Sequence, residues 1–477
     1  MKALVRNLKP FTGSLPGPPP ATWLLPSSAR AAGAGGSYYT TDLTVANSAT
    51  APVWVTAKFL GHDADGSGGT EKGFSLEAGT SRTFKDVLGS LFGVDSGYGA
   101  IRVTGSKGTL SVVGQTSTPG PNGGTFGQSV PGSGAGDLIR GGTPRSILGI
   151  REDSSFRTNL ILSNPNRTTV EVAVALISEK GETLGTKTYA VPPLGMMQAS
   201  RVVRDLGVSG DLSGARLQLS SAVLGTWFAA YATAIDNTTN DARTLLPALS
   251  SALLPSSARA QGQGGAFYTT DLSISNLGSI DAALTLKFLG HDQDGRSGIE
   301  KGVSLAAGRS VTYSDVLKSV FDVDSGYGAI EVRTAVQGVV ATSQTSTPGP
   351  GGGTFGQSVP LFGHGEYVTP ATPRSILGAR EDDAFRTNLI LANSTESAVD
   401  VDVALLSESG VSLGTKRIPL PPLGRTQVSR VVRALGVAHN TDGARLVLSI
   451  PTSGGEVAAY ASVIDNTTND PRTLLAR

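Results

Sequence analysis

The stretch Pro52–Leu60, "PVWVTAKFL", decides the fold because its apolar residues fall on every second position. The apolar side chains at positions 53, 55, 57 and 59 alternate with Trp54, Thr56 and Lys58. A later copy, "AALTLKFL" at positions 282–289, keeps the same alternation. Successive side chains of a β-strand point to opposite faces of the sheet. The stretch therefore predicts a strand with one buried face and one face in water.

Similar short runs recur along the chain, among them "DLTVAN", "GFSLEA", "GAIRVTG" and "TFGQSVP". Gly, Pro, Asn or Ser separates them at roughly 8 to 15 residues, a spacing typical of a β-sandwich rather than of βαβ units. One segment departs from this pattern. In "FKDVLGSLFGV", positions 84–94, the apolar residues at 87, 88, 91 and 92 follow helical spacing. This segment and its relatives "YSDVLKSVFDV" and "SRVVRDLGV" predict a short helix that crosses between strands.

The chain repeats itself at a constant distance. "LLPSSAR" at Leu24 returns at Leu253, and "DSGYGAI" at Asp95 returns at Asp324, in both cases 229 positions later (253 − 24 and 324 − 95). The motif "IDNTTND" recurs at the same distance. Loops are where lengths change first, so a shift that stays constant across many loops indicates a tandem duplication without insertions.

Each half contains a second, fainter repeat. "YTTDLTVAN" matches "FRTNLILSN", and "VTAKFL" matches "VAVALI", at a spacing of about 116 positions. We therefore predict an all-β chain of four tandem β-sandwich (Ig-like) modules, each with one short crossover helix, arranged as a duplicated pair. The predicted boundaries are 1–20 for a Pro/Gly-rich N-terminal segment, 21–131 and 140–247 for the first two modules, and 248–360 and 369–477 for their duplicates.

Composition narrows the classes of partner. The 477 residues include 39 Lys and Arg against 38 Asp and Glu, a formal net charge of +1, and no basic run stands out. Nucleic acid is therefore not an expected partner. The chain has no cysteine, which excludes disulfides and cysteine metal sites. No apolar run approaches the roughly 20 residues that span a bilayer, so we expect no membrane insertion. The first residues contain no apolar segment of secretory length before the prolines.

The order of motifs within a module resembles a known kind of repeat. A Gly-rich turn, "YTTDLTVAN", a "KFLGHD" strand, "SLEAGTSRTFKDVLGSLFGV", "GAIRV" and "GGTFGQSVP" look like the β-sandwich repeats found in tandem in large, poorly characterised secreted bacterial proteins. The resemblance covers nearly the whole chain outside 1–20. It implies an extracellular or cell-surface location and a structural or adhesive role, and it brings no catalytic residues with it.

Two glycine-rich loops concentrate acidic residues: "GHDADGSGGTEKG" at Gly61–Gly73 and "GHDQDGRSGIEKG" at Gly290–Gly302. Their carboxylates are oxygen ligands of the kind that calcium prefers. The calcium candidates are Asp63, Asp65, Glu71, Asp292, Asp294 and Glu300. Position 12 counted from Asp63 is Phe74, not the glutamate of a twelve-residue calcium loop. We therefore favour a solvated hairpin tip and expect no cofactor, with calcium as the alternative.

No catalytic residue emerges from the motifs. His62 and His291 correspond across the duplication, and each precedes an aspartate, but no nucleophile lies at a recognisable spacing. "GVSLG", which contains Ser412, formally matches a nucleophile elbow. The other half has Thr183 in its place, in a hairpin rather than a strand-to-helix turn. We therefore expect no enzyme activity.

Two tryptophans are candidate ligand contacts. Trp54 aligns with Ala283, and Trp227 aligns with Glu456, so both positions accept small or charged residues. This predicts that both indoles are exposed, where they could stack on a sugar ring or anchor a protein contact. The alternative is that they are incidental surface aromatics.

These observations predict a non-enzymatic extracellular or cell-surface structural or adhesion array. The alternative is a carbohydrate-binding accessory region of a secreted hydrolase. Under either prediction the expected partner is a protein or a glycan surface. Self-association through exposed sheet edges stays open as well.

Overall fold

The computed structural model describes residues 22–106, 110–249 and 252–477. The predicted N-terminal segment, 1–20, lies outside the described residues. Strands dominate and the helices are short, so the prediction of an all-β, sandwich-like fold is confirmed. Among the described residues, no helix combines the length and apolarity needed to cross a membrane.

The first part of the chain folds into one eight-stranded sheet in the order β4-β3-β6-β1-β2-β7-β8, with β5 paired to β2. Strand β1 curls the sheet, because its register against β6 shifts between Leu25 and Ser28 and its far end pairs with β2. The strands are β1 (Thr22–Ala32), β2 (Tyr38–Asn47), β3 (Val53–Gly61), β4 (Glu71–Leu76), β5 (Ser81–Phe84), β6 (Gly97–Gly105), β7 (Leu110–Pro119) and β8 (Thr125–Pro131).

The next part forms two sheets, β10-β15-β12-β13 and β14-β11-β16-β17, the second with β9 paired to β16. These two sheets are separate, whereas the long strand β1 makes the preceding part a single sheet. The strands are β9 (Ile139–Arg140), β10 (Arg145–Glu152), β11 (Phe156–Ser163), β12 (Val170–Ile177), β13 (Thr183–Val191), β14 (Met196–Ala199), β15 (Leu212–Ser220), β16 (Trp227–Asp236) and β17 (Ala242–Leu245).

The second half repeats this strand order: β21-β20-β23-β18-β19-β24-β25 with β22 on β19, then β26-β31-β28-β29 and β30-β27-β32-β33. The duplication in sequence is therefore a duplication of topology. The strands are β18 (Leu253–Gln261), β19 (Phe267–Asn276), β20 (Ala282–Gly290), β21 (Ile299–Leu305), β22 (Ser310–Tyr313), β23 (Gly326–Thr334), β24 (Val339–Pro348), β25 (Thr354–Pro360), β26 (Arg374–Glu381), β27 (Phe385–Asn393), β28 (Val399–Leu406), β29 (Ser412–Leu420), β30 (Arg425–Val428), β31 (Thr441–Ser449), β32 (Val457–Asp465) and β33 (Pro471–Leu475).

The predicted crossover helices are present. They are α1 (Val87–Ser90), α2 (Val202–Asp205), α3 (Val316–Ser319) and α4 (Val431–Ala434). The 3-10 turns are η1 (Ala34–Gly36), η2 (Gly66–Gly68), η3 (Pro121–Gly123), η4 (Gln263–Gly265), η5 (Gly295–Ser297), η6 (Pro350–Gly352) and η7 (His364–Glu366).

The repeated "TTDL" and "RTNL" motifs fix these helices. The residue before α1, Asp86, has a φ of 44°, and its backbone N–H donates to Oδ1 of Asp42 at 2.9 Å. Before α2, Arg201 has a φ of 51° and donates in the same way to Asn159 at 3.0 Å. A left-handed backbone is costly for a non-glycine residue. The acceptor on the neighbouring strand holds it in place, which explains why Asp or Asn recurs there.

The described residues form four hydrophobic clusters. The leucine of the repeated motif is fully buried in each: Leu43, Leu160, Leu272 and Leu389. Burying such side chains supplies the main driving force for a sheet with one apolar face. The division into four modules at the boundaries given above stays a prediction.

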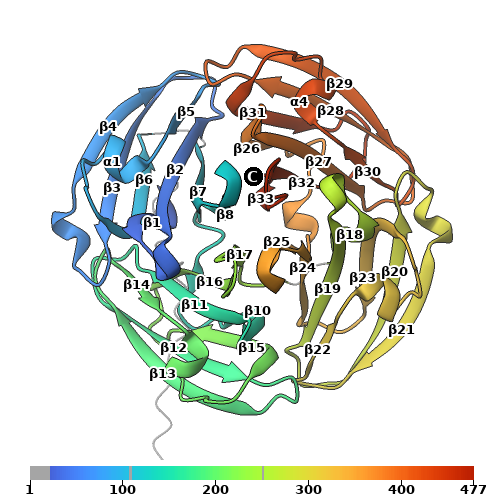
Figure 1. The fold of residues 1–477 in the computed structure, drawn as a ribbon, viewed down its shortest axis with the longest axis horizontal. Helices are drawn as coiled ribbons and strands as arrows, with labels where there is room; N and C mark the ends of the chain where they lie inside the picture. The colour runs from blue at the N-terminus through green and yellow to red at the C-terminus, as the bar shows by residue number, and fades with distance from the viewer. Residues whose placement is uncertain (1–21, 107–109, 250–251) are drawn as a thin grey trace, which may run out of the picture.

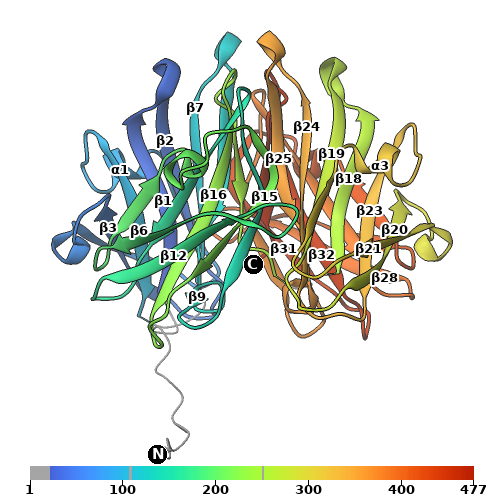
Figure 2. The same ribbon diagram turned by 90° about the horizontal axis from the view of Figure 1, so that it is seen from below.

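The sheets are arranged around a common centre, where β8, β17, β25 and β33 meet (Figure 1). The first and last parts of the described chain are in direct contact: the backbone N–H of Ser81 donates to the carbonyl of Glu408 at 2.8 Å. Seen from the side, the turns that join β1 to β2, β7 to β8, β18 to β19 and β24 to β25 project from one face (Figure 2).

The "IDNTTND" motifs make the contacts at this centre. Oδ2 of Asp236 accepts hydrogen bonds from the backbone N–H and the hydroxyl of Thr354, at 2.9 and 3.0 Å. Asp465 accepts the equivalent pair from Thr125, at 2.9 and 3.0 Å. The second contact links residues 340 positions apart in sequence. The motif therefore joins sheets that are distant along the chain.

A pair of equivalent aspartates meets where the two halves face each other. Asp241 and Asp470 are fully buried, and each carboxyl group affects the pKa of the other. Oδ2 of Asp241 accepts from the N–H of Gly356 at 2.9 Å, and Oδ2 of Asp470 accepts from Gly127 at 3.0 Å. Oδ1 of each aspartate has no donor of its own. A single proton between the two carboxyl groups would satisfy both.

Candidate ligand-binding clefts

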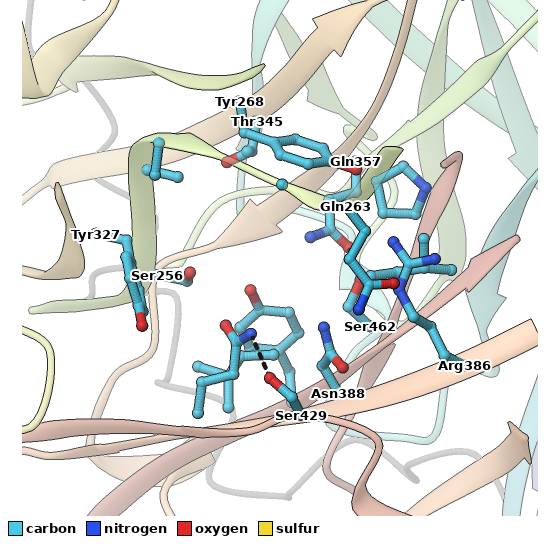
Figure 3. A pocket seen from close by; sticks show the side chains of 18 of the residues that line it. Ser256, Gln263, Tyr268, Tyr327, Thr345, Gln357, Arg386, Asn388, Ser429 and Ser462 are labelled. Carbon is cyan, nitrogen blue, oxygen red and sulfur yellow. Dashed lines mark hydrogen bonds between the residues drawn. The ribbon is translucent and has the colours of Figure 1, made fainter. Parts of the chain in front are cut away.

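Two polar clefts lie between facing sheets, one in each half of the chain. The C-terminal cleft has a volume of about 380 Å³ and the N-terminal cleft about 510 Å³. Volumes of this size are typical of small-molecule sites. In the C-terminal cleft, Tyr327 lies on one side and Arg386 on the opposite side (Figure 3).

Strand alternation places the residues of the C-terminal cleft. On β27, Leu389 and Leu391 point into the hydrophobic core, and Asn388 and Ile390, which alternate with them, face the cleft. Strand β32 behaves in the same way, with Tyr460 on the cleft side. The period of two in a strand thus gives one sheet both a core face and a polar, ligand-accessible face.

The two clefts are lined by matching residues 229 positions apart. Polar members common to both linings are Ser27 and Ser256, Tyr39 and Tyr268, Tyr98 and Tyr327, Thr116 and Thr345, Gln128 and Gln357, Arg157 and Arg386, Asn159 and Asn388, Gln198 and Gln427, Ser200 and Ser429, Arg201 and Arg430, and Tyr231 and Tyr460. Two divergent copies of one sequence therefore present the same set of hydrogen-bonding groups.

The chemistry of the clefts is neutral to cationic. Burial raises the pKa of Tyr268 to about 12 and also raises the pKa of Tyr39, so both hydroxyls stay protonated. They donate to the backbone carbonyls of Asn469 and Asn240, at 3.1 and 3.3 Å, and can accept from a ligand. No Asp or Glu side chain appears among the described lining residues of either cleft. Each cleft can therefore donate and accept hydrogen bonds to a ligand, and it attracts negative rather than positive charge.

One lining arginine in each cleft is held by neutral partners. Nη1 and Nη2 of Arg386 donate to the side-chain oxygens of Asn466 and Asn469, at 2.8 and 2.9 Å. In the N-terminal cleft the equivalent Arg157 donates to Asn237 at 2.8 Å. These amides fix the guanidinium without cancelling its charge.

The acidic loops lie outside these linings, at junctions between sheets. The backbone N–H of Asp63 donates to the carbonyl of Met196 at 2.8 Å, and that of Gly66 donates to Pro193 at 3.0 Å. A Cβ on Gly66 would lie 1.9 Å from the carbonyl oxygen of Leu194. The interpretation of these loops as solvated hairpin tips therefore holds for their carboxylates, which are exposed. It does not hold for their backbone, which packs against a neighbouring loop.

Five of the six calcium candidates each have a partner of their own. Oδ1 of Asp65 caps η2 by accepting from the N–H of Ser67 at 2.8 Å. Asp294 pairs with Arg296, and Glu300 pairs with Arg333. The other three lie as follows: Asp63 and Asp292 beside the adjacent histidines, at 3.2 and 3.1 Å from a ring nitrogen, and Glu71 exposed at the start of β4. Throughout the described ranges, no three His, Asp or Glu side chains converge on a position for a metal ion.

The two tryptophans differ in exposure. Trp54 on β3 is 57% exposed, as predicted. The prediction for Trp227 is wrong: it is half-buried, packs against the hydrophobic cluster that contains Leu43, and buries its indole nitrogen without a hydrogen-bond partner. In the other half, Glu456 occupies this position with a carboxylate oxygen 3.5 Å from the hydroxyl of Ser394. A charged replacement in one copy therefore does not imply an exposed side chain in the other.

None of the cleft residues was singled out from the sequence. Arg157, Asn159 and their copies lie within the "FRTNL" motif, where they served only to detect the repeat. A usable signal was present: polar and aromatic residues conserved between the two halves on the face opposite the core. No protein-family model matches the chain, and no curated protein matches it.

Proposed function

We propose that the protein is a non-enzymatic binding protein whose two clefts each hold a small hydroxylated ligand, with a carbohydrate as the best-fitting class. The observation that carries this proposal is the matched lining of the two clefts. Tyrosine, amide, hydroxyl and guanidinium groups occupy the same places in both halves. Sugars present apolar ring faces and a rim of hydroxyls, which aromatic rings and paired donors and acceptors complement.

The same lining favours binding over catalysis. Hydrolysis of a glycoside commonly needs a pair of carboxyl groups flanking the scissile bond. Within the described residues, the clefts offer no carboxyl group at all among their lining side chains. We place the protein outside the cell or at its surface, following the resemblance of its repeats to those of secreted proteins.

A structural or adhesive role through strand pairing is the second candidate. Strands β4, β13, β21 and β29 end their sheets and offer open edges. However, these edge strands carry Lys72, Lys187, Lys301 and Lys416, and β29 also contains Pro419. Lysine and proline on edge strands oppose strand addition. We therefore rank ligand binding in the clefts above self-assembly.

A glycan array probed with the full protein and three variants tests the proposal. The cleft variant, Tyr98→Ala with Tyr327→Ala, removes one aromatic wall from each cleft. Trp54→Ala removes the exposed indole, and Tyr38→Ala is the matched control, because Tyr38 is 41% exposed and lies outside both linings.

The proposal expects saccharide binding that the cleft variant loses and the other two variants retain. Melting curves must show the cleft variant to be folded. Binding lost only in Trp54→Ala would move the site to the outer face of β3. An array without any bound saccharide would overturn the carbohydrate assignment and favour the structural role.

A further inference from the structure

The two clefts differ in charge at one position, where Met196 of β14 corresponds to Arg425 of β30. The backbone is the same in both places: the carbonyl of Met196 accepts from Asp63 and that of Arg425 accepts from Asp292, each at 2.8 Å. The side chains diverge. Met196 is fully buried among apolar residues of the cluster that contains Leu43, whereas Arg425 lines the C-terminal cleft.

Arg425 is a buried cation with neutral partners. It is 1% exposed. Nη2 donates to the hydroxyl of Ser256 at 3.1 Å and to Oε1 of Gln427 at 3.0 Å, and Nη1 lies 3.4 Å from Nδ1 of His291. Nε has no hydrogen-bond partner. Burial lowers the pKa of Arg425, as expected where a charge is removed from water.

The nearest acidic group is engaged elsewhere. Oδ1 of Asp292 accepts from the hydroxyl of Thr426 at 2.7 Å, and Oδ2 lies 3.1 Å from Nε2 of His291. Within the described residues, no carboxylate oxygen lies within 4.0 Å of the Arg425 guanidinium. A buried charge without a counter-charge is costly unless a partner neutralises it.

The neighbouring aromatic residues have adapted to this change. In the N-terminal cleft, the Tyr98 hydroxyl lies 3.0 Å from Nε2 of His62. In the C-terminal cleft, the copy His291 turns Nε2 toward Asp292 instead. The guanidinium of Arg425 then lies 5.1 Å from the ring centre of Tyr327. This arrangement leaves Tyr327, at 37% exposure, beside the cation and open to the cleft.

We propose that the C-terminal cleft binds a hydroxylated ligand carrying an anionic group, carboxylate or phosphate, which pairs with Arg425, and that the N-terminal cleft, with Met196 at this position, lacks this preference for an anionic group. The inference rests on the proposed function for the hydroxylated part of the ligand. The anionic part rests on Arg425 alone. The duplication has thus produced two clefts with matching linings that differ in their preference for an anionic ligand.

Calorimetric titration with glucose, glucuronate and glucose 6-phosphate tests the selectivity and separates the two anionic groups. Arg425→Met copies the N-terminal cleft, and Arg425→Lys keeps the charge.

A charge-assisted hydrogen bond in a desolvated site is worth about 1.5–3 kcal/mol, roughly 10-fold to 100-fold in Kd. We expect an anionic sugar to bind the wild-type protein at least about 10-fold more tightly than glucose. Arg425→Met should abolish that preference and Arg425→Lys should largely preserve it. Equal affinity of the wild-type protein for all three sugars, or an unchanged preference in Arg425→Met, would overturn the inference.

A second measurement does not depend on sugar binding. Inorganic phosphate should raise the melting temperature of the wild-type protein above that in sodium chloride of equal ionic strength, and Arg425→Met should lose this difference. If phosphate acts through Arg425 but no sugar binds, the anion site stands and the carbohydrate proposal fails. If sugars bind without anion preference and phosphate has no specific effect, the carbohydrate proposal stands and this inference fails. Should Arg425→Met not fold, displacement of glucuronate by phosphate from the wild-type protein decides, and its absence counts against the inference.

Discussion

The aspartate pair between the two halves should make the protein less stable as pH rises toward and above neutrality. Burial is the main cause that raises the pKa of Asp241 from 3.8 to about 6, and burial also raises the pKa of Asp470. Between these values the folded state holds a proton that the unfolded state has released. The pair therefore contributes its full stabilisation below the pKa of the unfolded state. This contribution is lost as the pH rises through the pKa of the folded state. For Asp241 the loss is about 3 kcal/mol, since each tenfold change in an equilibrium constant is worth about 1.36 kcal/mol.

Replacing Asp470 with asparagine copies the protonated partner. The amide oxygen can accept from Gly127, as Oδ2 of Asp470 does, and the amide nitrogen can donate to Asp241. At pH 8 the variant should be more stable than the wild-type protein, because its amide hydrogen takes the place of the proton that the wild-type pair has lost. At about pH 4 the two should be alike, because the wild-type pair then holds its own proton.

Urea unfolding between about pH 4.5 and 8.5 measures the effect. The difference in unfolding free energy between variant and wild type cancels the contributions of titratable groups that both proteins share. Asp95→Asn, at an exposed position, is the control. Arg243 and Arg472 each place Nε 3.7 Å from the nearer carboxylate. If these cations instead keep both aspartates ionised, the pair will cause no fall in wild-type stability between about pH 4.5 and 8.5, and Asp470→Asn will be destabilising. That result would refute the shared proton.

Two further predictions concern the acidic loops. Gly66→Ala should cost about 1–3 kcal/mol, because its Cβ would meet the carbonyl of Leu194 at 1.9 Å, whereas Gly68→Ala, with open space around its Cβ, should cost far less. Urea midpoints compare the two, and equal losses would show that the loop does not pack there. Replacing the four aspartates of both loops with asparagine should leave stability almost unchanged, by no more than about 0.5 kcal/mol per exposed site, and melting curves in millimolar calcium and in chelator should coincide. A shift of several degrees with calcium that the asparagine variant loses would establish metal sites.

The strands and helices were predictable because they follow from local patterns. The alternation of apolar and polar residues around Trp54 can be seen from adjacent positions alone. The constant offset between the two halves shows that the second copy keeps this alternation. The same reasoning misjudged Trp227, since comparing two copies shows which residues a position accepts, not what covers it. The contact of Gly66 was also hidden. A glycine that permits close approach of two backbones looks in sequence like a glycine that permits a turn.

The clefts could not be predicted because no local pattern defines them. Tyr327, Asn388 and Tyr460 come from three strands that only the facing of two sheets brings together. Each of these residues looks like the polar or exposed face of an ordinary strand. The charge difference at Met196 and Arg425 is visible in the sequence, but its meaning depends on burial, which the sequence does not state.

A crystal structure of the protein in complex with the saccharide that binds best on the array tests the central claim most directly. The account predicts the sugar inside a cleft, against Tyr98 in the N-terminal half or Tyr327 in the C-terminal half, with an acidic group at Arg425 when the saccharide carries one. A sugar stacked on Trp54, with both clefts holding only water, would contradict it.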